Sequence, residues 1–416
     1  MAAQGSDISR EQLGRLLRVT RMLTVTTDLD ALLQCIAEAT CDMLDCERAS
    51  IFLHDAKSRE LWTKVALGSR EIRVPDTSGI VGAAFTSNTL IHVPDPYQDP
   101  RFNPEPDRQS GFRTRSLLTV PTGDASNKPI GVLQAVNKRG PGFTADDLLL
   151  GQALADSVGV AIQRYMLQQQ AIEGAELRRE MTLARDVQDA LIPREPPQVP
   201  GLLCAGYTRP ASITGGDGFD YWMLPDGRLA FFLGDAAGHG IAPAMIVAQA
   251  RTLLRALAEI DTNPHWLMCR VNSRAAADMA AGRFVTIFFG VLSPDGILHW
   301  SSGGHGPILL QRRCGGPVEL LEPSGPPIGV VDPFLGEQMP PIEIEQGGRV
   351  VVLSDGLFEA FSPAGEQLGV DRIVAVVERS TAPPADLIRQ LQSLALQWQQ
   401  HDEPMDDQTA VVVQRL

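Results

Sequence analysis

One proline-free stretch in the middle of the chain most restricts how this sequence can fold. Within residues 165–192, apolar side chains recur at steps of three and four with charged residues between them, at Leu177, Met181, Ala184, Val187 and Leu191. This spacing predicts an amphipathic helix, which the proline-rich sequence PREPPQVPG ends. The helix is either a surface helix of a neighbouring domain or half of a parallel dimer. In both cases it separates an N-terminal from a C-terminal domain.

The segments on either side of this helix differ in pattern. Residues 1–165 begin and end with helically spaced apolar residues around short strand-like runs, which predicts an α+β domain with helices flanking an antiparallel sheet. Residues 166–199 hold the connecting helix and the proline-rich connector. Residues 200–416 alternate β-rich runs with helical stretches at 241–257, about 264–281 and 384–399. That alternation predicts a β-sandwich covered by helices.

Bulk composition argues against several classes of protein. A formal net charge of −14 disfavours binding to nucleic acid, although clustered carboxylates can still hold divalent cations. The six cysteines form no CxxC pair, which indicates reduced thiols in a cytoplasmic protein rather than a disulfide framework or a zinc site. The polar N-terminus and the lack of a long apolar run predict neither a signal peptide nor a membrane span.

Aspartates stand at the ends of strand-like runs in the C-terminal segment. They are Asp217 in SITGGDGFDYW, Asp235 after LAFFLG, Asp355 after RVVVLS, and Asp406 with Asp407 before the run AVVVQRL. Each alone is typical of a turn, and the glycines around Asp217 also suit a phosphate-binding loop. No helix with a Lys-Ser/Thr pair follows that loop, however. Because strands of one sandwich can bring these ends to one edge, we expect a carboxylate cluster that cations stabilise.

The chemistry of such a cluster is specific. Hard oxygen ligands favour Mg²⁺ or Mn²⁺ over zinc. Two ions about 3.5–4 Å apart can share a water, lower its pKa and bind a phosphoryl oxygen. No Gly-x-Ser-x-Gly or Ser-His-Asp arrangement competes. The sequence therefore predicts metal-assisted hydrolysis of a phosphate ester.

The C-terminal motifs also resemble those of a known family. The order GGDGFD, LGDAAGHG, SSGGHGPILL, LSDGLFEA and DDQT, preceded by ARDVQDALIPREPPQVPG, is similar to bacterial PPM-type (protein phosphatase 2C-like) serine/threonine phosphatases of the sporulation and stress-regulator branch. The resemblance implies an αββα sandwich that uses two Mn²⁺ or Mg²⁺ ions to dephosphorylate a phosphoprotein of the anti-sigma-factor antagonist type. The alternative is an inactive phosphatase fold that only binds its partners.

The resemblance also assigns roles to residues. The implied metal ligands are the Ala236 carbonyl and the carboxylates of Asp217, Asp235, Asp355 and Asp406, with Asp235 bridging the two ions and a metal-held water as nucleophile.

Four neighbouring residues receive supporting roles. Asp220 and Asp407 are expected to orient water or a ligand, and His239 and His305 to support the fold. The glycines before Asp217 are expected to let the backbone bend so that its carboxylate reaches the ions.

The N-terminal segment resembles the GAF domains of cyclic-nucleotide phosphodiesterases and some bacterial adenylyl cyclases. The similarity runs from ASIFLHD through SGIVGAAF to NKRGPGFTADD. Asn137, Lys138, Phe143 and Asp147 fit that family's signature, whereas Leu148 stands where the family has Glu. In the family the Lys and Asp of the signature form a structural salt bridge, which is the role expected of Lys138 and Asp147.

By position in that family, eight residues would line a ligand pocket. They are Ser50, Ile80, Val81, Asn103, Asp107, Ser110, Thr114 and Gln134. Ile80 and Val81 fit a helix N-terminus, whose N–H groups can bind a phosphate. Asp107, Ser110 and Thr114 suit a purine edge or a ribose.

Two substitutions weaken this prediction. Ala66 and Asn103 replace aromatic stacking residues, which costs about 1–3 kcal/mol of binding. The expected ligand is cAMP or cGMP. Another small molecule, or a GAF domain that only dimerises, is the alternative. A homodimer is expected, in which ligand binding changes phosphatase activity through the connecting helix.

Overall fold

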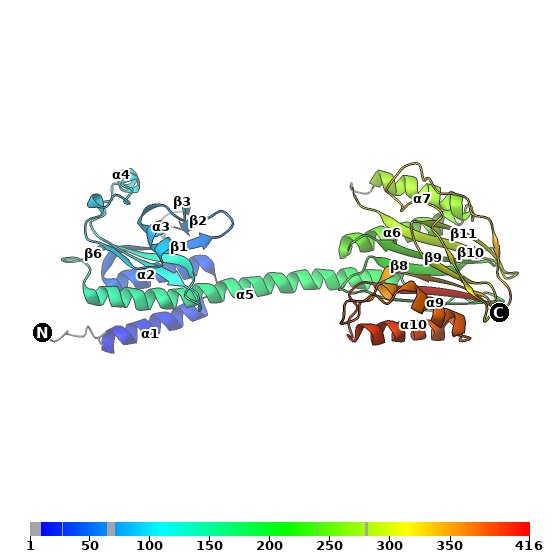
Figure 1. The fold of residues 1–416 in the computed structure, drawn as a ribbon. Coiled ribbons are helices and arrows are strands. Elements are labelled where there is room, and N and C mark those ends of the chain that lie inside the picture. Colours follow the sequence, from blue (N-terminus) through cyan, green and yellow to red (C-terminus); the bar gives the residue numbers. More distant parts are fainter. Residues whose placement is uncertain (1–9, 27, 65–70, 239, 279–281) are drawn as a thin grey trace. The chain divides into compact units, whose positions relative to one another are not determined.

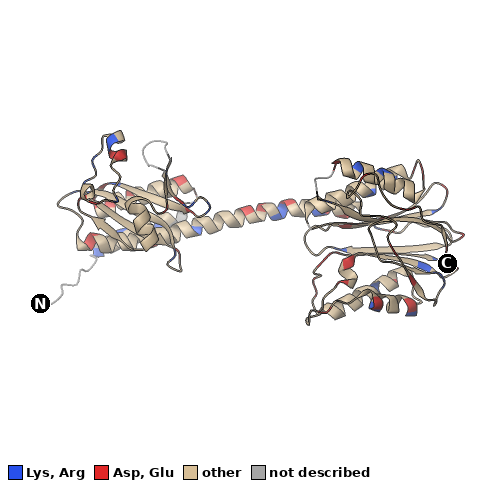
Figure 2. Ribbon diagram, turned by 45° about the horizontal axis from the view of Figure 1, so that its top comes forward, with Lys and Arg blue, Asp and Glu red and all other residues tan. Residues whose placement is uncertain are grey.

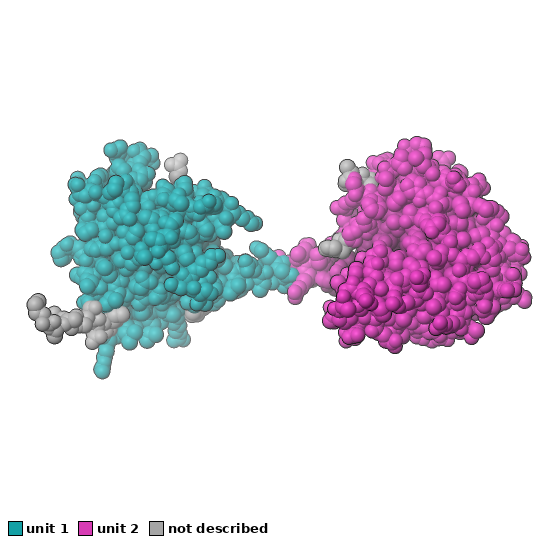
Figure 3. All heavy atoms as spheres, viewed as in Figure 1, with its two compact units in different colours: residues 1–175 teal, residues 176–416 magenta. Residues whose placement is uncertain are grey.

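The computed structural model describes residues 10–26, 28–64, 71–238, 240–278 and 282–416. The chain divides into two compact units, residues 1–175 and 176–416 (Figure 3). Two residues with expected roles, Ala66 and His239, lie outside the described ranges.

The first unit is built on a six-stranded sheet with the order β3-β2-β1-β6-β5-β4 (Figure 1). Every neighbouring pair is antiparallel, as predicted. The strands are β1 (Cys46–Asp55), β2 (Glu60–Lys64), β3 (Glu71–Pro75), β4 (Ile91–Val93), β5 (Leu117–Gly123) and β6 (Pro129–Lys138).

Helices cover both faces of this sheet. Successive side chains of β1 point to opposite faces of the sheet and pack into two different apolar clusters. Ile51 and Leu53 belong to one cluster and Phe52 to the other. The face with Ile51 and Leu53 is covered by α1 (Arg10–Val25), α2 (Leu29–Leu44) and the start of α5 (Ala145–Leu191). The face with Phe52 is covered by α3 (Gly79–Ser87). The link from β4 to β5 holds η1 (Pro96–Gln98) and α4 (Glu105–Ser110).

Helix α5 is a single helix of 47 residues that begins in the first unit and ends in the second. Thr144 caps its start, since the Asp147 carboxylate accepts hydrogen bonds from the Thr144 N–H at 2.8 Å and its hydroxyl at 3.0 Å. The closing helix of the first domain and the connecting helix, predicted separately, are therefore continuous. Figure 2 shows charged residues distributed along its length.

The second unit contains two five-stranded antiparallel sheets, ordered β14-β11-β10-β9-β8 and β13-β12-β15-β16-β7 (Figure 1). The first sheet comprises β8 (Asp217–Met223), β9 (Leu229–Ala236), β10 (Val285–Leu292), β11 (Ile297–Gly303) and β14 (Ile342–Glu343). The second comprises β7 (Leu202–Arg209), β12 (Ile308–Gln311), β13 (Val318–Leu321), β15 (Arg349–Leu353) and β16 (Gln408–Arg415).

Side chains of both sheets form the central core of this unit. Phe231 and Phe288 of the first sheet share one buried cluster with Val350 and Val411 of the second. The outward faces pack on helices: α6 (Ile241–Leu257) and α7 (Pro264–Asp278) cover the first sheet, and α8 (Asp355–Phe358), α9 (Val370–Arg379) and α10 (Pro384–Gln399) the second. This is the predicted αββα sandwich.

The described helices offer no candidate for a membrane span, since none combines sufficient length with sufficient apolar character.

Candidate active site

Asp217 and Asp235 lie side by side at one end of the first sheet. Asp217 is the first residue of β8, and it is directly opposite Asp235 of β9 in the antiparallel ladder. Opposed residues project from the same face of a sheet, so the two carboxylates are neighbours. Asp217 is only 4% exposed, and its Oδ2 atom has no hydrogen-bond partner among the described residues.

Asp355 and Asp406 come from the second sheet. Asp355 follows β15 and begins α8, while Asp406 lies just before β16, which pairs with β15. The Ser354 hydroxyl joins these two segments, because it accepts from the Thr409 N–H at 2.8 Å and donates to the Asp407 carbonyl at 3.1 Å. The segments are so close that a Cβ at Gly356 would lie 2.2 Å from the Asp407 carbonyl oxygen.

The charges of the two sheets interact. Burial, and then the charge of Asp235, raises the pKa of Asp217 well above its usual value. Burial, followed by the charges of Asp355, Asp406 and Asp407, raises the pKa of Asp235 to about 7. Burial and the charge of Asp406 also raise the pKa of Asp355. Carboxylates from both sheets are therefore close enough for their charges to oppose the ionisation of Asp217, Asp235 and Asp355.

These residues suit a divalent cation with oxygen ligands. Among the described residues, no group of three His, Cys, Asp or Glu side chains could hold a metal ion as it stands. Mg²⁺, however, is usually bound by one or two carboxylates and keeps several waters. The unpartnered Asp217 Oδ2 and the mutual repulsion of the carboxylates are features that such an ion would relieve.

The two glycines before Asp217 also have a role that was not expected. Gly215 and Gly216 are not among the residues with positive φ. Instead, a Cβ at Gly215 would lie 2.6 Å from the Asp407 Oδ2 atom, and one at Gly216 would lie 2.5 Å from the Ala236 carbonyl oxygen. The glycines therefore permit close approach of the strand that carries Asp235 and of Asp407, in a segment that bends at residues 211–214 and 216.

The structure assigns Asp407 and Asp220 to the support of backbone and helix. Asp407 accepts hydrogen bonds from the N–H groups of Ala211 at 2.7 Å and Gly216 at 2.6 Å, which fixes the segment leading to Asp217. Asp220 is fully buried, and its Oδ2 atom lies 2.8 Å from nitrogens of both Arg251 and Arg255 of α6. The structure thus places two arginines on the Asp220 carboxylate, and the expectation that Asp220 orients water or a ligand stays a prediction.

His305 supports the fold, as expected. It is 3% exposed and its Nδ1 atom lies 2.9 Å from the Thr286 hydroxyl. The Ser302 hydroxyl accepts from the His305 N–H at 3.1 Å. Burial lowers the pKa of His305 to about 4, so the imidazole is neutral at pH 7.

Gln188, near the end of α5, was missed in the sequence. Its Nε2 atom donates to the Gly215 carbonyl at 2.9 Å and the Asp217 carbonyl at 3.3 Å, and its Oε1 atom accepts from the Gly215 N–H at 3.3 Å. The apolar series of this helix passes through Val187 rather than Gln188, so it gave no signal for this residue.

Four of the residues predicted to bind a ligand in the first unit form two neighbouring pairs. Thr114 donates from its N–H at 2.7 Å and its hydroxyl at 2.8 Å to the buried Asp107 carboxylate, which also accepts from the Tyr97 hydroxyl at 3.0 Å. Ser50 and Gln134 are opposite each other on β1 and β6. Gln134 donates to the Thr119 hydroxyl at 3.1 Å.

The other predicted ligand residues are more dispersed. Ile80 and Val81 lie in the first turn of α3, with buried side chains in two different apolar clusters. Asn103 is exposed, and its Oδ1 atom accepts from the Glu105 N–H at 3.0 Å. Ser110 is the last residue of α4.

The expected salt bridge of the first unit is present. The Lys138 Nζ atom lies 2.8 Å from an Asp147 carboxylate oxygen and donates to the Leu44 carbonyl at 2.8 Å. It therefore ties β6 to the start of α5 and the end of α2.

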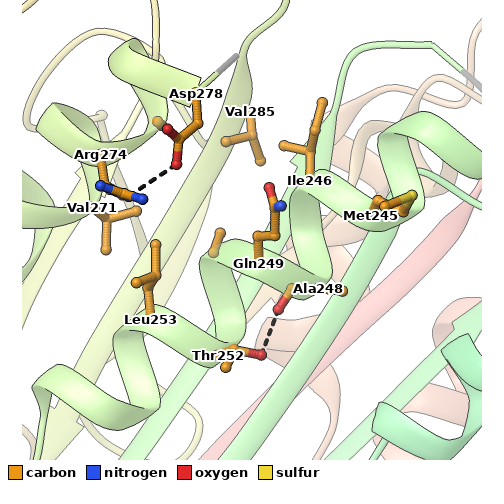
Figure 4. Close-up of a pocket in the computed structure, with 12 residues that line it drawn as sticks. Met245, Ile246, Ala248, Gln249, Thr252, Leu253, Val271, Arg274, Asp278 and Val285 are labelled. Atoms are coloured by element: carbon orange, nitrogen blue, oxygen red, sulfur yellow. Dashed lines mark hydrogen bonds and ion pairs between the residues drawn. The ribbon is translucent and has the colours of Figure 1, made fainter.

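A separate groove lies between α6 and α7 and has a volume of about 460 Å³ (Figure 4). Its walls are mainly apolar and include Met245, Ile246, Leu253 and Val271. None of the predicted metal or ligand residues lines it.

Family models match both units. Residues 28–162 match the GAF domain, and residues 225–416 match stage II sporulation protein E (SpoIIE). The chain carries a GAF domain followed by a SpoIIE-type, PPM-class phosphatase domain. The SpoIIE match includes Asp235, Asp355 and Asp406.

Individual proteins resemble parts of this chain. The dual 3′,5′-cyclic-AMP and -GMP phosphodiesterase 11A of Takifugu rubripes is 32% identical over 166 residues, which are 36% of this chain and 18% of that protein. Protein IcfG of Synechocystis is 24% identical over 254 residues, 54% of this chain and 39% of IcfG. This chain thus spans well under half the length of either relative.

A solved structure supports the fold of the second unit. The SiaA-PP2C domain of Pseudomonas aeruginosa aligns with a TM-score of 0.51 at 18% identity, covering 59% of this chain and 99% of that domain. At this identity the likeness concerns the fold.

Proposed function

We propose that the SpoIIE-type domain is a metal-dependent phosphatase that removes phosphate from serine or threonine of a protein. The observation that carries this proposal is the carboxylate cluster, in which Asp217 and Asp235 of one sheet interact with Asp355 and Asp406 of the other. Such a cluster has no evident stabilising role without cations, because each charge raises the free energy of the next.

Two Mn²⁺ or Mg²⁺ ions would be held by the carboxylates of Asp217, Asp235, Asp355 and Asp406 and by the Ala236 carbonyl. Asp235 would be shared between the ions. When bound, the ions would supply a water of lowered pKa and positive charge for the phosphoryl oxygens. The protein's own contribution is to hold the carboxylates in position. Asp407 holds the backbone of the Asp217 segment through two N–H groups, and the Ser354 hydroxyl fixes the two strands that carry Asp355 and Asp406.

We infer that the substrate is a phosphoprotein of the anti-sigma-factor antagonist type. The match to the SpoIIE family supports this class. The rival function, a phosphatase fold that binds a partner without turnover, retains the same carboxylates but predicts no hydrolysis.

For the GAF domain we propose a cyclic nucleotide, cAMP or cGMP, as regulatory ligand. The support is the similarity to a phosphodiesterase whose name specifies both nucleotides. Asp107 and Thr114 engage each other, and Gln134 engages Thr119. A nucleotide would therefore have to share or replace these internal hydrogen bonds. Another ligand, or dimerisation alone, stays the alternative. We also propose that the chain acts as a cytoplasmic homodimer.

The phosphatase proposal is tested by phosphate release from a serine-phosphorylated protein with and without Mn²⁺. The wild-type chain should require Mn²⁺ and lose activity in chelator. Asp355→Asn should lower kcat about 100-fold or more, since a ligand carboxylate is lost. Asp371→Asn, which changes an exposed aspartate at the start of α9, should leave the rate unchanged. Metal-independent release, or full activity of Asp355→Asn, would refute the proposal.

A further inference from the structure

The last turns of α5 lie directly against the segment that delivers Asp217 to the carboxylate cluster. Three hydrogen bonds join the Gln188 amide to Gly215 and Asp217, at 2.9, 3.3 and 3.3 Å. One turn earlier, an Arg185 guanidinium nitrogen lies 3.5 Å from the Ile213 carbonyl oxygen. A side-chain amide that both donates and accepts toward the same segment fixes its position as well as its distance.

The bonded segment cannot be held by its own side chains, because residues 215 and 216 are glycines. Its backbone is fixed from two other directions: the Asp407 carboxylate accepts from the Gly216 N–H at 2.6 Å, and the Gly216 carbonyl accepts from the Ala236 N–H at 3.0 Å. Gln188 adds hydrogen bonds to the Gly215 and Asp217 carbonyls and to the Gly215 N–H, beside the pairing of Asp217 with Asp235 in the β8–β9 ladder. Helix α5 is therefore one of the elements that hold the backbone of Asp217.

One oxygen of the Asp217 carboxylate is free of protein partners in the part of the chain that the structure describes. Its Oδ2 atom has no hydrogen-bond partner among the described residues, although the side chain is 4% exposed. Gln188 and Asp217 line the same small cavity, together with Arg251 of α6. A change at Gln188 is thus transmitted to this carboxylate through one peptide unit.

We infer that Gln188 is a positioning residue for the metal site: through the Gly215 and Asp217 backbone it sets the Asp217 carboxylate where it can share a divalent cation with Asp235. This role rests on the proposed metal-dependent function and adds a residue from outside the sandwich to it. Groups that orient metal ligands commonly alter metal affinity by about 10–100-fold when they are replaced.

Gln188→Met provides the test, because methionine keeps the length and flexibility of the side chain but neither donates nor accepts comparable hydrogen bonds. Gln170→Met is the matched control, since Gln170 is exposed on the same helix. Isothermal titration with Mn²⁺ should show the dissociation constant of Gln188→Met raised about tenfold or more, with Gln170→Met equal to wild type. Without metal, amide hydrogen exchange over residues 213–218 should be faster in Gln188→Met alone.

The outcomes separate the two proposals. If wild type and Gln188→Met bind Mn²⁺ equally while Asp217→Asn binds it weakly, the metal site stands and the role of Gln188 is overturned. If wild type itself binds no Mn²⁺, the metal-dependent function fails and the role of Gln188 fails with it. Should Gln188→Met melt below wild type, Gln188→Ala and the exchange data over 213–218 decide whether the loss is local; unchanged exchange there overturns the inference.

Discussion

At the scale of single residues, buried acidic groups of the phosphatase domain fall into two kinds. Asp220 and Asp407 have partners in the protein, two arginines and two backbone N–H groups respectively. In Asp217, by contrast, the Oδ2 atom has no hydrogen-bond partner among the described residues. Burial of a carboxylate oxygen without a partner costs free energy, which a bound cation would offset.

His305 makes the stability of this domain depend on pH. Its pKa is about 4 in the folded chain, against an ordinary value of 6.5. The unfolded chain therefore binds a proton that the folded chain rejects between these values. This contribution to stability is complete above pH 6.5 and is lost as pH falls toward 4, by up to about 3 kcal/mol.

Thermal unfolding of wild type and His305→Gln from pH 8 to pH 4 measures this effect. Wild type should be more stable at pH 8 and lose its advantage as pH falls through 6 and 5. A difference in melting temperature that does not change with pH would contradict the buried neutral imidazole.

Part of this residue-level description follows from the sequence alone. Each metal-ligand candidate could be named because aspartates end strand-like runs within recognisable motifs. The pairing of Asp217 with Asp235 could not, because the register of two strands is a long-range property. The arginine partners of Asp220 were missed for the same reason, because Arg251 and Arg255 lie on α6, which follows β9 in the chain.

At the scale of elements, the helices that were predicted correctly are those with a strong local sequence pattern. The helices at 241–257 and 384–399 have the predicted bounds, because long amphipathic or apolar stretches carry enough periodicity. The expected helix N-terminus at Ile80 and Val81 is the start of α3, a short helix with two glycines, whereas α8, of only four residues, was not predicted. Tertiary packing, not propensity, makes such short helices stable.

Helix α5 has a charge pattern that favours a parallel pair with a second copy. Val160, Leu167, Gly174 and Met181 recur every seven residues, and Val160 and Leu167 are 57% and 58% exposed. In that register Glu173 of one helix faces Arg178 of the other in a parallel, in-register pair. Glu180 and Arg185 repeat the spacing. An antiparallel pair would instead oppose like charges.

Charge reversal tests this arrangement by sedimentation. Glu173→Arg and Arg178→Glu, each alone, should weaken self-association about tenfold through repulsion, and an equimolar mixture should restore a heterodimer. Arg179→Glu, which changes the neighbouring outward residue, serves as control. Stronger self-association of either variant would indicate an antiparallel pair, and no change in any sample would exclude this interface.

At the scale of the whole molecule, a GAF domain and a phosphatase domain share one continuous helix. That continuity could not be deduced from the sequence, because the apolar pattern changes where the helix leaves the first core. It gives a ligand in the GAF domain a covalent route to Gln188 and Asp217, provided that the ligand favours one arrangement of the helix over another.

Binding of cAMP and cGMP tests the sensory half of this proposal. Titration calorimetry on the full chain should show one of them binding, with AMP as control, and saturating ligand should change the rate of phosphate release. Gln134→Leu should weaken that binding while leaving the basal rate unchanged. If neither nucleotide binds, the GAF domain has another ligand or only dimerises.

The claim on which the rest depends is that the aspartates of the two sheets hold divalent cations. The most direct measurement is the Mn²⁺ content of the chain after equilibrium dialysis, for wild type, Asp235→Asn and the control Asp371→Asn. Two-metal sites of this kind predict about two ions per chain for wild type and the control, and one or none for Asp235→Asn, whose carboxylate would be shared. Wild type without bound Mn²⁺, or Asp235→Asn with the wild-type content, would contradict it.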